Sequence, residues 1–243
     1  MASSGPRTYT RHVDARLRNR AIAPRYSVKD AAQLLARPEQ TIRRWSIGNR
    51  RRYRNKQVFD APLIAIDGEA GRNGVPLSFL NLLELRMLSQ YRDEAALQAI
   101  RAALRFAAHE MQVERPLLTV EFHVRGGELF AAFERTPEGH KMLVSATRGG
   151  QLPLLLPKVA TEVTADVDYE HDVARGWWPI SRDHPVVVDL RIAAGRPVTS
   201  ETGVRVDAIQ TRLAQGWTVE QITHDTGARV HEVEAAQRLE LAA

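Results

Sequence analysis

The chain has 243 residues, is 44% hydrophobic and carries a net charge of +5, which predicts two or three small domains with apolar cores and excludes a disordered tail protein. It contains no cysteine, which excludes disulfides, a thiolate nucleophile and cysteine-ligated zinc. The first 25 residues lack the apolar region of a secretory signal, and no run of about eighteen apolar residues occurs. We therefore expect a cytoplasmic protein.

Positive charge is concentrated at the N-terminal end. The first 60 residues hold fifteen Lys and Arg against four Asp and Glu, so they carry +11 and the rest of the chain carries −6. Such a split is typical of a polyanion-binding end joined to a neutral or acidic remainder. We assign residues 1–25 to a basic tail, which is either an arm laid along DNA or a disordered terminus.

Residues 26–75 have the pattern of a winged helix-turn-helix. Ser27 and Asp30 are placed to cap a first helix, which Ala36 to Pro38 end. Pro38 suits the first turn of a second helix. In that helix Ile42 and Trp45 fall on the inner side at a spacing of three residues, and an arginine-rich segment that we read as a wing follows.

The outward side chains of this segment suit DNA. Guanidinium and amide groups match the hydrogen-bonding edges of guanine and adenine in the major groove. The alternatives are a surface helix pair whose arginines are merely solvated, and RNA binding. The predicted DNA-binding residues are Gln40, Thr41, Arg43, Arg44, Arg50, Arg51, Arg52, Tyr53 and Arg54.

Residues 76–181 are predicted to hold dimerisation helices and a β subdomain. The segment Leu77–Tyr91 is apolar on nearly all faces, so such a helix must be buried on two sides. We expect a homodimer through this helix, because its apolar surface exceeds what one neighbour covers. The predicted interface residues are Leu80, Leu83, Met87 and Tyr91.

The following segment alternates apolar and polar residues from Leu118 to Val124, and Gly126-Gly127 then supplies a hairpin turn. Further strands are expected at residues 142–145, 152–156 and 165–169. An acidic run consists of Asp166, Asp168, Glu170, His171 and Asp172. Three of its carboxylates could converge on one strand face, but a solvated edge of a half-buried strand explains the pattern more simply.

Residues 182–243 predict a short strand, a glycine-punctuated loop and a three-helix module. Thr218 and Gln221 form a capping box for the second helix, and Gly227 makes the turn to the third. This segment carries seven Lys and Arg against nine Asp and Glu. Because carboxylates are repelled by a phosphate backbone, we expect the module to bind protein rather than DNA.

No catalytic constellation is evident. His109-Glu110 and His231-Glu232 begin like a zinc-protease helix, but Val113 and Ala235 stand where a second histidine would be needed. The chain also lacks a phosphate loop and a nucleophile elbow. We therefore predict an α+β, mainly helical protein that is not an enzyme and has no metal site and no cofactor.

Two segments resemble known families. SVKDAAQLLARPEQTIRRW followed by RRRY resembles the MerR-like winged helix-turn-helix, and the segment with PVVVDLRIAAGRPV and LAQGWTVEQI is similar to the small helical domain common in VapB-like antitoxins. Between them, LSFLNLLELRML, RGGQLPLLL and WWP occur in the order seen in long antitoxins of that type.

The resemblance implies a dimeric antitoxin of a type II toxin–antitoxin system. Such a protein binds its own operator and neutralises a PIN-like ribonuclease toxin. On this reading Glu232, Glu234 and Trp217 face the toxin. The rival hypothesis is a free-standing MerR-like transcriptional regulator whose β subdomain senses a small molecule, and RNA processing is a third.

Overall fold

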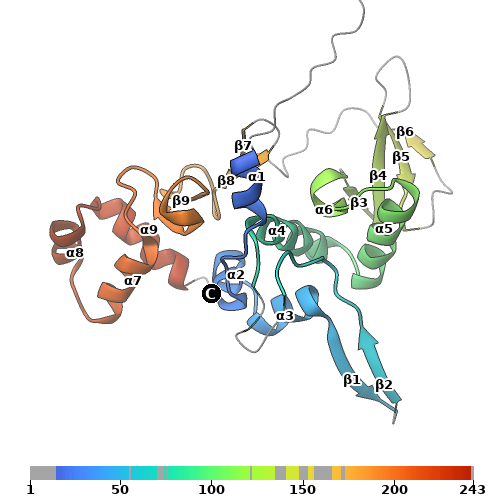
Figure 1. Cartoon of the computed structure of the whole chain (residues 1–243), viewed down its shortest axis with the longest axis horizontal. Coiled ribbons are helices and arrows are strands. Elements are labelled where there is room, and N and C mark those ends of the chain that lie inside the picture. Colours follow the sequence, from blue (N-terminus) through green and yellow to red (C-terminus); the bar gives the residue numbers. More distant parts are fainter. Residues whose placement is uncertain are drawn as a thin grey trace, which may run out of the picture.

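The computed structural model describes residues 15–54, 56–69, 74, 76–120, 122–134, 141–147, 153–155, 166–170 and 173–241. The fold is α+β and mainly helical, as the sequence predicts. The α-helices are α1 (Ala15–Ile22), α2 (Val28–Leu35), α3 (Glu39–Ile47), α4 (Phe79–Glu94), α5 (Leu97–Glu110), α6 (Pro116–Thr119), α7 (Val206–Ala214), α8 (Val219–Thr226) and α9 (Val230–Leu241). Figure 1 shows α4 near the centre, with α7–α9 and the strands β3–β6 on opposite sides of it.

The strands form three antiparallel sheets. The wing is β1 (Asn49–Tyr53) with β2 (Lys56–Asp60). The second sheet has the order β3-β4-β5-β6 and the third has the order β10-β9-β8-β7. Their strands are β3 (Phe122–Arg125), β4 (Glu128–Glu134), β5 (Lys141–Ser145), β6 (Pro153–Leu155), β7 (Val167–Glu170), β8 (Val173–Trp177), β9 (Val186–Asp189) and β10 (Pro197–Thr199).

The predicted hairpin is present, but it begins later than expected. Leu118 lies in the short helix α6, which starts at Pro116, and β3 begins only at Phe122. A proline at the first helical position favours this turn, because its missing N–H has no helical partner to lose. Gly126 and Gly127 make the turn between β3 and β4 at φ values of 57° and 78°, which favour glycine.

The predicted dimer helix is the central core helix of the monomer. Ser78 caps α4, and α4 contacts α1, α2, α5 and α6 of the same chain. Leu83, Met87 and Tyr91 are only 3%, 6% and 5% exposed, and Leu80 is half-buried. The Tyr91 ring packs edge-on against Phe122, with ring centroids 5.9 Å apart. The predicted interface is therefore wrong for Leu83, Met87 and Tyr91, because elements of the same chain already cover them, and it stays a prediction for Leu80.

The predicted basic tail is wrong for residues 15–22, and residues 1–14 lie outside the described part. Ala15–Ile22 forms α1, which contacts α4 and β8. Leu17 and Ala21 are buried, with 4% and 0% exposure. Spaced four residues apart, they give an otherwise basic helix one apolar face. Residues 15–22 are thus part of the core.

The C-terminal module is continuous with the preceding sheet and also contacts the helix-turn-helix. The predicted boundary between residues 181 and 182 falls inside the sheet, since β9 pairs with β8. The Tyr26 hydroxyl donates a hydrogen bond of 2.5 Å to the Gly195 carbonyl, and the Arg25 guanidinium donates to the Ala194 carbonyl. Burial raises the pKa of Tyr26, so its hydroxyl keeps the proton that it donates. The module is therefore anchored at two places.

Candidate nucleic-acid interface

The helix-turn-helix is built by local capping signals. The Asp30 amide donates to Ser27 Oγ over 3.0 Å, and the Ser27 amide donates to Asp30 Oδ2 over 2.8 Å. This reciprocal pair satisfies amides at the start of α2 that have no helical partner. Ala36 ends the helix in the left-handed region, and Pro38 immediately precedes α3. The two helices begin and end close to the positions that the sequence predicts.

The recognition helix α3 turns its apolar side inward and its polar side outward. Ile42 and Trp45 are 0% and 3% exposed. Gln40, Arg43 and Arg44 are exposed and Thr41 is half-buried. Neither arginine makes an ion pair with any described residue, so both guanidinium groups have donors available for base edges or phosphates.

The wing projects from the body as a two-stranded ribbon (Figure 1). Arg50, Arg52 and Arg54 are exposed, whereas the side chains of Arg51 and Tyr53 lie outside the described part of the structure. Gly48, at φ 79°, joins α3 to β1, and a Cβ there would lie 2.4 Å from the Asp60 carbonyl oxygen. Glycine is thus required for the wing to leave the helix at this angle.

The sequence interpretation missed one wing residue. Phe59 is 57% exposed and lies opposite Arg50 in the strand register. The Arg50 guanidinium carbon lies 6.0 Å from the centroid of the Phe59 ring, which is a cation–π contact. The only signal in the sequence was an aromatic residue in the short KQVFD segment that follows the arginine run. The contact restrains Arg50 beside the recognition helix.

The wing is also tied to α3 from behind. The segment Ala61–Ala65 follows β2 and leads back towards the core; we call it the strap. The Leu63 amide in the strap donates a hydrogen bond of 2.8 Å to the Trp45 carbonyl near the end of α3. Displacement of the strap would therefore move the wing relative to the recognition helix.

The predicted toxin-facing residues separate into two kinds. Glu232 is 0% exposed, and its carboxylate accepts hydrogen bonds from the Glu201, Thr202 and Arg229 amides and from the Thr202 hydroxyl. A carboxylate enclosed in this way holds a loop and cannot face a partner, so this assignment is wrong. Glu234 is exposed beside Arg238, and Trp217 is 39% exposed beneath the Arg212 guanidinium.

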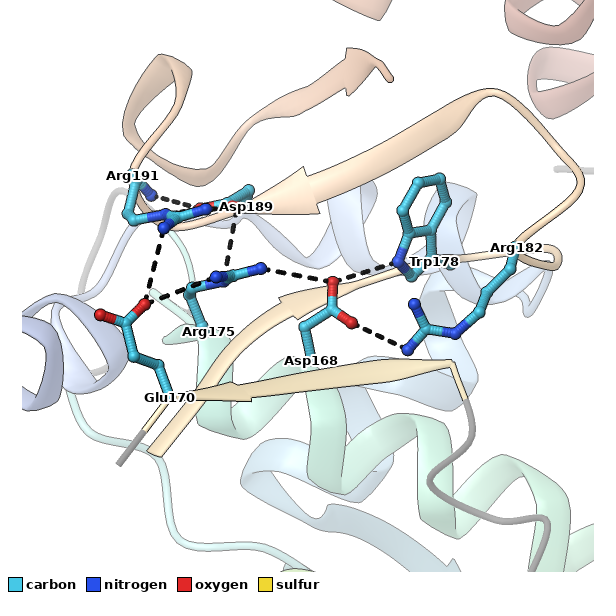
Figure 2. A network of polar contacts seen from close by, with 7 residues as sticks. All are labelled: Asp168, Glu170, Arg175, Trp178, Arg182, Asp189 and Arg191. Carbon is cyan, nitrogen blue, oxygen red and sulfur yellow. Dashed lines mark hydrogen bonds and ion pairs between the residues drawn. The ribbon is translucent and has the colours of Figure 1, made fainter. Parts of the chain in front are cut away.

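The described carboxylates of the acidic run pair with arginines, as Figure 2 shows for Asp168 and Glu170. Asp168 accepts from Arg182 over 2.8 Å and from the Trp178 indole over 3.2 Å. Burial opposes ionisation of Asp168, but these hydrogen bonds and the nearby guanidinium charges hold its pKa below the usual value.

The neighbouring carboxylates in and next to β7 are held in the same way. Glu170 lies within ion-pair distance of Arg175 and Arg191, and Asp166 pairs with Arg86. His171 and Asp172 lie outside the described residues. The carboxylates are thus engaged in a structural ionic network rather than merely solvated at a strand edge.

The described residues contain no group of three or more His, Cys, Asp or Glu side chains placed to hold a metal ion. Among the same residues, no helix is both long enough and apolar enough to cross a membrane.

Comparisons with known proteins agree with the N-terminal geometry. Residues 24–104 match the family described as "Putative DNA-binding HTH domain", and residues 186–238 match the family described as "Protein of unknown function (DUF433)". A search of curated proteins finds no match. The chain therefore contains a helix-turn-helix DNA-binding domain, and its C-terminal module is similar to the second family.

A solved structure shares the overall fold. The X-ray crystal structure of Rv2018 from Mycobacterium tuberculosis aligns with a TM-score of 0.56 and 20% sequence identity, covering 88% of this chain and 98% of the other. At this identity the likeness concerns the fold alone.

Proposed function

We propose that the protein is the antitoxin of a type II toxin–antitoxin pair, which represses its own operon and neutralises a PIN-like ribonuclease toxin. The observation that carries the DNA-binding half is the outer face of α3, where Arg43, Arg44 and Gln40 are exposed beside a basic wing. The second half rests on the sequence resemblance and on the match of the C-terminal module to the DUF433 family.

The DNA-binding half is tested by a pair of arginine variants. Arg43→Ala should remove about 1–3 kcal/mol of discrimination between operator and random duplex, because a bidentate contact to guanine is lost. Arg52→Ala is the matched control, since the same charge is removed from the wing. It should weaken both duplexes alike and lower the salt dependence of binding. Equal affinity of the unaltered protein for operator and random DNA would exclude specific recognition.

The antitoxin half is a proposal of binding rather than catalysis. In and beside the third sheet, Asp168, Glu170 and Asp189 lie within ion-pair distance of Arg175, so these carboxylates are engaged in structural contacts. Of the predicted toxin-facing residues, Glu234 and Trp217 remain accessible. A ribonuclease must attract RNA, so the surroundings of its active site tend to be basic, and acidic side chains can associate with them.

Deleting residues 184–243 is not a clean test, since this would remove β9 from β8 and expose Tyr26. The chain should instead be co-expressed with the adjacent reading frame, with Trp217→Ala/Glu234→Lys compared against Asp183→Lys, which changes an exposed carboxylate that makes no ion pair with a described residue. We expect the first variant to lose toxin capture and the second to retain it. If the intact chain captures nothing, the free-standing regulator becomes the better account.

Homodimerisation remains part of the proposal, because one small helix-turn-helix makes few base contacts and two copies reading a pseudo-palindrome give useful specificity. The surface involved must differ from the buried face of α4. Aspartate substitutions at Leu83 or Met87 would unfold the core and would not report on assembly. Light scattering should give twice the chain mass of 27.3 kDa, and a mass of one chain would refute this part.

A further inference from the structure

A cavity of about 310 Å³ lies behind the wing. Its walls come from the strap, α4, α5 and α6. Apolar side chains of Leu63, Leu104 and Leu117 line it, together with the charged residues Arg101 and Glu84. This volume is at the lower end of the range for small-molecule sites, and the mixture of apolar wall with few polar groups is typical of them.

The polar feature that points to a ligand is Arg101. Its Nη2 atom is buried and has no hydrogen-bond partner within the described part of the chain. A buried guanidinium donor without an acceptor is destabilising, so an unpaired one calls for an explanation. The nearest candidate in the protein is already engaged, since the Glu84 carboxylate accepts from Arg115 over 2.7 Å and from Asn81 over 3.0 Å.

The charges around the cavity narrow the chemistry of the occupant. Arg101 and Arg105, one helical turn apart on α5, supply positive charge, whereas Glu114 supplies negative charge and Glu84 is already paired with Arg115. These acids repel a phosphate dianion more strongly than a monoanion. A carboxylate carries a single charge and has the planar, two-oxygen geometry that a guanidinium group binds best. The apolar wall favours a hydrocarbon or aromatic body on that carboxylate.

We propose that this cavity binds a small apolar carboxylic acid, whose carboxylate pairs with Arg101 and whose body lies against the strap. The occupant thereby changes DNA affinity, a consequence that rests on the proposed operator-binding function. The link is physical: Leu63 contributes to the cavity wall, and its amide is bonded to Trp45 at the end of the recognition helix. A ligand that shifts Leu63 also shifts the wing relative to α3.

The test uses octanoate and 3-phenylpropionate as probes, with octan-1-ol and 3-phenylpropan-1-ol as neutral matches. Amide NMR spectra of the full chain are recorded as each compound is added to about 10 mM, a concentration that detects weak affinities. We expect at least one acid to shift the amide resonances of Leu63 and Leu104. The matching alcohol should have an affinity lower by a factor of about ten or more. No shift with either acid, or equal binding of acid and alcohol, would overturn the proposal.

Variants of Arg101 test whether its guanidinium group binds the carboxylate of the ligand. Arg101→Gln should weaken the acid about tenfold or more, and Arg101→Lys should restore part of the affinity because it keeps the charge. Arg18→Gln on the remote helix α1 is the charge-matched control and should bind as the unaltered chain does. Because Arg101 has no hydrogen-bond partner among the described residues, its variants should remain folded. Unchanged binding by Arg101→Gln would refute the assignment.

The DNA measurement is separate from the binding measurement. Operator affinity should change when the bound acid saturates the cavity. If the acid binds and operator affinity stays the same, the coupling through the strap is refuted. If the chain binds no operator in the absence of any acid, the proposed function fails, and the NMR shifts still decide whether the cavity is a carboxylate site.

Discussion

Replacing Glu232 tests whether this carboxylate holds the C-terminal module together. It lies in the first turn of α9 and receives hydrogen bonds of 3.1, 3.1 and 2.9 Å from the amides of Glu201, Thr202 and Arg229, and one of 2.6 Å from the Thr202 hydroxyl. Glu232→Ala leaves these four donors without their acceptor. An unsatisfied buried donor is destabilising by about 1–3 kcal/mol. Because water can reach some of these four donors in the variant, we expect the free energy of unfolding to fall by about 3–4 kcal/mol in total.

The assay is urea unfolding at neutral pH, with Glu234→Ala as the matched control. Glu234 lies on the same helix and also carries one negative charge, but it is exposed and 3.7 Å from Arg238. The control should therefore lose no more than about 0.5 kcal/mol. If the free energy of unfolding of Glu232→Ala is within about 0.5 kcal/mol of that of the unaltered chain, the carboxylate does not hold the loop and the reasoning fails.

The same carboxylate gives the variant a distinct pH dependence. Burial alone would raise the pKa of Glu232, but the hydrogen bonds from Arg229, Thr202 and Glu201 hold it below 4.5, the usual value for glutamate. A lowered pKa in the folded state contributes stability that is present above 4.5 and is lost as the pH falls. The stability difference between the unaltered chain and Glu232→Ala should therefore shrink in acid.

Two further predictions concern buried contacts elsewhere. Burial raises the pKa of Glu84 to about 7 despite its bond to Arg115, so the folded state holds this proton more tightly than the unfolded chain and stability falls from pH 4.5 to 7. In Glu84→Gln, this fall in the free energy of unfolding, measured with urea, should be smaller by up to about 3 kcal/mol. Coincident pH profiles of the variant and the unaltered chain would refute the prediction. Gly195→Ala should lose about 1–3 kcal/mol, because its Cβ would lie 2.9 Å from Tyr26 Oη at φ 80°. The control is Tyr26→Phe, which loses only one hydrogen bond and should lose about 1 kcal/mol of stability. An unchanged urea midpoint of unfolding for Gly195→Ala would contradict the clash.

The helix-turn-helix could be predicted from the sequence because its signals are local. The capping box of α2 spans four residues, and the inward pair Ile42 and Trp45 follows from helical spacing alone. The same holds for α8, where Thr218 and Gln221 cap the helix as expected. Such features depend on neighbours within one turn, so no knowledge of the tertiary fold is needed.

The errors arose where the partner of a residue lies far away in the sequence. An all-round apolar helix such as α4 shows that burial is needed, but not whether another subunit or the same chain provides it. Glu232 reads as an outward glutamate because its partners Glu201 and Thr202 come 30 or so residues earlier. The contact between Tyr26 and Gly195 spans 169 positions and has no local signal.

The count of charges could not distinguish free arginines from paired ones, and the structure makes this distinction. In the third sheet and the turn after β9, Arg175 and Arg191 lie within ion-pair distance of carboxylates, so their charge is largely compensated within the protein. On α3 and the wing, Arg43, Arg44 and Arg52 are exposed and make no ion pair with a described residue. Only a cation that neutralises phosphate displaces counterions from DNA. The salt dependence of DNA binding should therefore follow the N-terminal arginines and be insensitive to those of the sheet, although the residue type is the same in both places.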